Sequence, residues 1–210
     1  MYIATSTRPN IAFAVSCLSC FLDCYRTEHW NAAIRVLRYL KGTCSLSLTL
    51  GGTASLSLTG YSDSDYSNCA DSSKSVGGYC YSLGSGIVSW SSRKQDSVAD
   101  SSCYAEYIAL HAATHEAVFL RQLLTELSLS PTQPTPLYCD NDAATRLAED
   151  HVWHSRTKHI HVKYHYTREQ VHEGNISVTC VRSSDNLADI FTKPLSRTDF
   201  ERLRHHLGLS

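Results

Sequence analysis

The order in which strands and helices are expected along residues 56–194 constrains the fold more than any other feature of the sequence. Three short runs of strand-forming residues come first, at about 56–63, 77–83 and 86–91. Gly84-Ser85-Gly86 joins the last two as a tight hairpin turn. These runs therefore predict three consecutive antiparallel strands.

Helices and strands alternate over the rest of this region. Residues 102–127 carry apolar side chains at helical intervals, with small ones in the first half, and three prolines follow. Strands are expected at 137–139 and 176–181, and further helices at 143–149, at 157–173 and from Leu187 until Pro194. An antiparallel group followed by this alternation predicts an α/β fold, with a mixed sheet covered by helices.

The first 50 residues are expected to be helical and to lie apart from the sheet. Helical periodicity covers residues 9–24 and 28–41, and Gly42 is a suitable helix end. A passage rich in Ser, Leu, Thr and Gly follows at 45–58. We therefore place a domain boundary here, between residues 1–50 and residues 56–210.

Composition limits the class of protein. The chain has 210 residues, 42% of them hydrophobic and 19% charged, which suits one globular core with a small appendage and excludes full disorder. No run of 18 apolar residues is present, so we expect no association with a membrane. The nine cysteines come without a secretory signal and are expected to be free thiols. Cys17, Cys20 and Cys24 suit either zinc or one apolar helix face, and the helix is favoured because no second Cys/His pair follows.

Charge is distributed unevenly although the net charge is only −1. Residues 51–150 carry 12 acidic and 5 basic side chains, whereas basic residues exceed acidic ones on both sides. An acidic centre between basic flanks suits a cation-loaded site that receives a polyanion. Ordinary solvated surface gives the same pattern, and from charge alone it is the preferred explanation.

Acidic residues recur where the expected elements begin or end. Asp63 closes the first strand, Glu106 lies in the first turn of the long helix, Asp140 follows the short strand and Asp189 opens the last helical segment. If the four carboxylates converge, repulsion keeps some of them protonated unless cations intervene. Oxygen ligands without Cys or His suit Mg²⁺ or Mn²⁺. Taken singly, each acid is better explained as a cap or turn residue, so spacing alone assigns no role.

Seven short motifs surround these acids and the expected hairpin. They are GYSDSDY (60–66), SVGGYC (75–80), VSWSSRKQ (88–95), AEYIAL (105–110), LYCDN (137–141), RTKHI (156–160) and LADIFTKPL (187–195). In this order, over about residues 60–207, they resemble the ribonuclease H domain of copia-type LTR retrotransposon Pol polyproteins. The N-terminal motifs RPNIAFAV (8–15) and LRYLKGT (37–43) are similar to the end of the reverse transcriptase in the same polyproteins.

This resemblance implies a division of the chain and a location. Residues 1–50 are a helical remnant of the reverse transcriptase C-terminal region, and residues 56–210 a ribonuclease H-like domain with a mixed five-stranded sheet flanked by helices. The chain is then a C-terminal fragment of a Pol polyprotein whose reverse transcriptase is a partner. We expect it in the cytoplasm, in a retrotransposon particle, or in the nucleus.

The resemblance also implies an activity. The family hydrolyses the RNA strand of RNA–DNA hybrids by a two-metal mechanism, with Mg²⁺ or Mn²⁺. Carried over residue by residue, Asp63, Glu106, Asp140 and Asp189 are the catalytic metal ligands. The hybrid is the expected substrate and partner.

A basic, histidine-rich segment follows the short helix at 143–149. Its candidates for nucleic-acid contact, interpreted as neutralising phosphates beside aromatic rings, are Arg156, Lys158, His159, Lys163 and Arg168. The alternative is a solvated helix face with Val162 and Tyr166 turned inward. His161 and His165 have a spacing that suits zinc, but no nearby ligand pair supports such a site.

Two other classes of function compete with the nuclease. One is a catalytically decayed nucleic-acid-binding or protein-binding module of the same fold. The other is a structural remnant, in which residues 1–50 only cover an apolar face. A hybrid-cleavage assay with Mg²⁺ and an EDTA control separates the nuclease from the binding module. Deletion of residues 1–50 and a measurement of solubility test the structural remnant.

Overall fold

A mixed sheet of five strands lies at the centre of the computed structural model, which describes residues 1–51, 57–66, 73–149 and 161–210, except the side chains of 161–164. The order β3-β2-β1-β4-β5 is formed by β1 (Leu58–Asp65), β2 (Val76–Leu83), β3 (Gly86–Lys94), β4 (Thr135–Cys139) and β5 (Ile176–Cys180). β1, β2 and β3 pair antiparallel, whereas β4 pairs parallel with both β1 and β5. The predicted mixed five-stranded sheet is thus confirmed.

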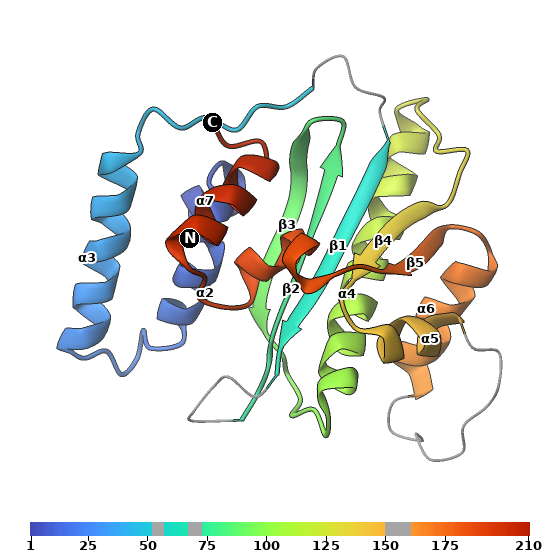
Figure 1. Cartoon of the computed structure of the whole chain (residues 1–210), viewed down its shortest axis with the longest axis horizontal. Helices are drawn as coiled ribbons and strands as arrows, with labels where there is room; N and C mark the ends of the chain where they lie inside the picture. Colours follow the sequence, from blue (N-terminus) through green and yellow to red (C-terminus); the bar gives the residue numbers. More distant parts are fainter. Residues whose placement is uncertain (52–56, 67–72, 150–160) are drawn as a thin grey trace.

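Helices cover both faces of this sheet (Figure 1). One face carries α4 (Ser102–Glu126), α5 (Asp142–Glu149) and α6 (His161–His172), and the other carries α2 (Ala12–Ser19), the 3-10 helix η3 (Leu187–Phe191) and α7 (Arg197–His206). Alternation along β2 separates the two cores, because Tyr81 packs with α4 whereas Cys80 packs with η3 and α7. In the described part of the chain, no helix is both long enough and apolar enough to cross a bilayer.

The N-terminal appendage is helical, as expected, and contacts the sheet and the C-terminal end of the chain. It consists of α1 (Tyr2–Ser6), the 3-10 helix η1 (Pro9–Ile11), α2 and α3 (Thr27–Gly42). Trp90 on β3 donates from Nε1 to the Ala4 carbonyl at 2.7 Å. The backbones of Ser47 and Ser210 exchange two hydrogen bonds, at 3.0 and 3.2 Å. The division at residues 50–56 remains a prediction.

The first helix is shorter than the predicted 9–24. α2 ends at Ser19, and the chain then forms tight turns in which Phe21 N–H donates to the Leu18 carbonyl and Cys24 N–H to the Phe21 carbonyl. The Phe21 ring stacks on His29 of α3 with 4.0 Å between ring centroids, which turns the chain out of the helix. Cys20 and Cys24 are therefore exposed beyond α2, and the prediction that they share a helix face with Cys17 is wrong.

η3 lies directly on the sheet because β2 has a glycine beneath it. A Cβ at Gly78 would come within 2.7 Å of Phe191 Cβ and 2.9 Å of Thr192 Cγ2. Asn186, fully buried, caps η3 by accepting from Ala188 N–H at 3.1 Å. Its Nδ2 also donates to the carbonyl of Ser62 on β1 at 2.9 Å. These contacts fix η3 beside Asp63, which is paired with Gly78 in the register of β1 and β2.

We therefore expect Gly78→Ala to lower the free energy of unfolding by about 1–3 kcal/mol, because the added methyl overlaps η3. Gly77→Ala is the matched control: its nearest neighbour, Gln95 Nε2, would lie 3.4 Å from the new Cβ. Denaturant unfolding measures both variants. Equal losses of stability for the two would contradict the close approach of η3 to β2.

Candidate active site

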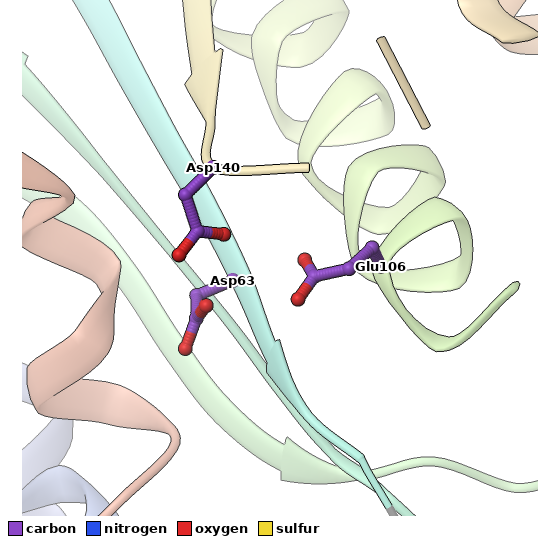
Figure 2. A group of neighbouring side chains, drawn as sticks. All are labelled: Asp63, Glu106 and Asp140. Atoms are coloured by element: carbon purple, nitrogen blue, oxygen red, sulfur yellow. The ribbon is translucent and has the colours of Figure 1, made fainter. Parts of the chain in front are cut away.

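Three carboxyl groups from separate elements meet at one edge of the sheet. Asp63, Glu106 and Asp140 each place one oxygen so that the three atoms lie within 4.8 Å of one another. Figure 2 shows the carboxyl groups directed toward one another from β1, from α4 and from the residue after β4. Because β1 and β4 are parallel neighbours, their carboxyl ends bring Asp63 and Asp140 together.

Glu106 is positioned by a side chain that follows β3. Gln95 is buried and donates from Nε2 to the Ala105 carbonyl at 2.9 Å and to Ser64 Oγ at 3.1 Å. These bonds tie the start of α4 to β1 next to Asp63. The start itself is capped by Ser101, because its Oγ accepts from Tyr104 N–H at 3.2 Å.

Asp140 lies at the turn between β4 and α5. The next residue, Asn141, caps α5 by accepting from Ala144 N–H on its Oδ1 at 3.0 Å. The chain therefore leaves the sheet immediately after Cys139, which leaves the Asp140 side chain facing the other two acids (Figure 2).

The two most buried carboxyls resist ionisation. Asp63 is 2% exposed and Glu106 7%. Burial raises the pKa of Glu106 to about 9, and the charges of Asp63 and Asp140 add to the shift. Burial also raises the pKa of Asp63 to about 7, with Asp189 and Asp140 adding to the shift and Lys193 and the Thr192 hydroxyl opposing it. Without a cation, these acids cannot all be charged at neutral pH.

Asp189 lies next to this group of three and is joined to it through Lys193. Lys193 Nζ is 2.9 Å from Asp189 Oδ1 and 3.8 Å from Asp63 Oδ2. Burial raises the pKa of Asp189, an effect that its hydrogen bond with Lys193 opposes. Although burial alone would lower the pKa of Lys193, Asp63 and Asp189 raise it, so that this side chain is a cation.

The donor set suits a hard divalent cation. All three converging groups are carboxylates, and Glu106 Oε2 is buried with no hydrogen-bond partner among the described residues. Repulsion within the group favours any ion that neutralises it. Among the described residues, this is the one group of three or more Asp, Glu, His or Cys close enough to hold a metal, so neither the cysteines nor the histidines described form another.

Most of the residues predicted to contact nucleic acid lie outside the part of the chain that the structure describes. Arg156, Lys158 and His159 lie outside the described residues, and Lys163 belongs to α6 but its side chain is not described. Arg168 donates from Nε to the Leu147 carbonyl at 2.8 Å, which ties α6 to α5. Tyr166 is half-buried and stacks on His115 of α4, with 4.0 Å between ring centroids, in agreement with the alternative that Tyr166 turns inward.

The sequence patterns did not identify the side chains that hold the acids in place. Lys193, Thr192, Asn186 and Gln95 all contact the site or its supports. The spacing of Asp189 and Lys193, four residues apart, is a sequence signal for an ion pair. Asn186, two residues before Ala188, has the position of a helix cap, but its bond to Ser62 depends on the tertiary fold.

The raised pKa values predict how the cation-free protein responds to pH. The folded state holds protons that the unfolded chain has lost, because folding raises the pKa of Asp63 from 3.8 to about 7 and that of Glu106 from 4.5 to about 9. This stabilisation is complete below the unfolded pKa values and is lost as pH rises through the folded ones. In EDTA we expect Tm to be lower at pH 9 than at pH 5 by about 10 °C or more.

Two variants of α4 test that prediction. Glu106→Gln should flatten the dependence of Tm on pH, because the amide resembles the protonated acid. Glu126→Gln, which changes an exposed acid on the same helix, should retain the dependence. If Tm changes with pH to the same extent in wild type and in Glu106→Gln, the raised pKa of Glu106 is contradicted.

Known proteins similar to this chain are retrovirus-related Pol polyproteins from plant transposons. No family model matches the chain. It is 43% identical over 204 residues to the retrovirus-related Pol polyprotein from transposon RE1 of Arabidopsis thaliana, covering 97% of this chain and 14% of that polyprotein. It is 39% identical over 209 residues to the corresponding polyprotein from transposon TNT 1-94 of Nicotiana tabacum, covering 100% of this chain and 16% of the polyprotein.

Among solved structures, the chain is similar to the N-terminal RNase H domain of a Mycobacterium tuberculosis protein, with a TM-score of 0.49 and 14% identity over 72% of this chain and 98% of that one. The chain spans only 14% to 16% of the length of the two polyproteins. Its identity to them nevertheless extends over essentially all of its own residues. Over essentially all of its own residues, the chain is therefore similar to one segment of Pol polyproteins from copia-type LTR retrotransposons.

Proposed function

We propose that this segment is a metal-dependent endonuclease that hydrolyses the RNA strand of RNA–DNA hybrids, as part of a retrotransposon Pol polyprotein. The observation that carries the proposal is the convergence of Asp63, Glu106 and Asp140 within 4.8 Å of one another at the carboxyl ends of β1 and β4. Burial of acids this close to one another destabilises the folded state. A bound cation neutralises their charge and removes this destabilisation, so the group favours cation binding. The identity of the chain to a segment of retrotransposon Pol polyproteins supports the choice of a nucleic-acid substrate.

The residues that would hold the metal are Asp63, Glu106 and Asp140, with Asp189 beside Asp63. Mg²⁺ or Mn²⁺ is the proposed ion, because the donors are all carboxylate oxygens. When bound, such ions supply the positive charge that lowers the pKa of an attacking water and stabilises the leaving oxygen of a phosphodiester.

The chain's own groups orient this site. The Thr192 hydroxyl donates to Asp63 Oδ2, and the Ser64 backbone N–H donates to the Glu106 carboxylate, so both acids are held from the protein side. Glu106 Oε2, which has no such partner among the described residues, is left for a ligand. Preference for RNA would depend on protein contacts to 2′-hydroxyls across the minor groove of the hybrid.

The other proposals follow from the same assignment. Arg156, Lys158, His159, Lys163 and Arg168 are proposed to contact the phosphates of the hybrid, and the reverse transcriptase of the polyprotein is the proposed protein partner. The proposed location is the cytoplasm, within a retrotransposon particle, or the nucleus.

Asp140→Asn tests the catalytic role. We expect it to reduce Mg²⁺-dependent cleavage of an RNA–DNA hybrid by more than about 100-fold while the domain stays folded, because it removes a ligand charge. Asp142→Asn is the matched control: this acid lies two residues further, is exposed and forms an ion pair with Arg146 at 2.9 Å. It should retain cleavage.

Two outcomes would oppose the proposal. Cleavage by folded Asp140→Asn at the wild-type rate would remove Asp140 from the site. A wild-type protein that binds the hybrid in Mg²⁺ but leaves its RNA strand intact would favour a decayed, nucleic-acid-binding form of the same fold. Circular dichroism of each variant establishes that it is folded.

A further inference from the structure

Lys193 occupies a special place in the carboxylate site. It lies four positions after Asp189 and two residues beyond the end of η3, and its Nζ reaches both Asp189 Oδ1 at 2.9 Å and Asp63 Oδ2 at 3.8 Å. The Thr192 hydroxyl donates to the same oxygen of Asp63. The space between Asp63 and Asp189 is therefore held by a cation that belongs to the chain itself.

The two halves of the site consequently differ. The half formed with Glu106 and Asp140 has convergent carboxylates and a buried oxygen, Glu106 Oε2, without a partner among the described residues. The half formed by Asp63 and Asp189 already has its charge offset by Lys193. A divalent ion that enters the first half displaces only protons, whereas one that enters the second must replace an ion pair.

Lys193 is able to leave this position. Its side chain is 31% exposed, whereas that of Asp63 is 2% exposed, so the ammonium group borders on solvent. The four-carbon stem of lysine is flexible, and its head group is readily hydrated. Movement of the head group into water therefore requires no rearrangement of η3.

We propose that Lys193 is a positioning residue that competes with a divalent cation for the space between Asp63 and Asp189. The first cation binds with Asp63, Glu106 and Asp140, and a second binds more weakly because it must displace Lys193. Without cations, Lys193 offsets part of the repulsion among the acids and keeps the site assembled. This inference rests on the proposed metal-dependent function.

Calorimetric titration of the protein with Mn²⁺, without nucleic acid, tests the proposal. Wild type should show one stronger and one weaker site. Lys193→Met keeps the length of the side chain and removes its charge, so the weaker site should tighten by about fivefold to tenfold. Lys193→Arg, which retains the charge, should leave the second site weak, and Lys41→Met on the exposed part of α3 is the control for a lost lysine.

Thermal unfolding in EDTA gives an independent readout. Lys193→Met should melt at a lower temperature than wild type and Lys41→Met, because the acids lose their internal counter-ion, and saturating Mn²⁺ should recover most of the difference. Should Lys193→Met not fold, Asp189→Asn replaces it. That variant should lose the second ion while binding the first with wild-type affinity.

The outcomes separate the two proposals. Lys193→Met can bind one Mn²⁺ tightly and still have the second-site affinity of wild type and the melting temperature of wild type in EDTA. That result would overturn the role of Lys193 and leave the metal-dependent nuclease in place. An unchanged second-site affinity in Asp189→Asn would also overturn the role of Lys193. A wild-type protein that binds no Mn²⁺ would overturn both.

Discussion

Repulsion among buried carboxylates is the constraint on which the site depends. Asp63 and Glu106 are almost fully buried, and Asp140 completes a group whose oxygens lie within 4.8 Å of one another. In the absence of a cation, the site relieves this repulsion by retaining protons and by the ion pair of Asp189 and Asp63 with Lys193. A divalent ion is the third solution, and it alone leaves every acid ionised. The same arrangement thus destabilises the empty site and gives it affinity for metal.

The fold serves to bring these groups together from distant parts of the sequence. The parallel pairing of β1 and β4 places two acids at one edge of the sheet, and α4 crosses that edge to add a third. The contact of η3 with Gly78 and the bond of Asn186 to β1 bring Asp189 and Lys193 to the same place. The absence of a side chain at Gly78 is required for this contact, since a methyl group at position 78 would keep η3 away from Asp63.

Much of this could be predicted from sequence because the signals are local. Strand alternation and the glycine-rich turn indicated the strands, and acids at element ends indicated where a site would form. Local patterns predict less where tertiary contacts decide the outcome. Stacking of Phe21 on His29 ends the first helix early, and α7, which begins at a Ser196 cap beyond Pro194, was not predicted. The role of Lys193 depends on Asp63, 130 residues away in sequence, and no local pattern reports such a contact.

Crystals of the protein soaked with Mn²⁺ and measured at the manganese absorption edge test whether the three carboxylates hold a cation. We expect an anomalous peak bounded by the carboxylates of Asp63, Glu106 and Asp140. Crystals that take up manganese elsewhere, or that show these three carboxyl groups turned away from one another with no ion between them, would contradict it.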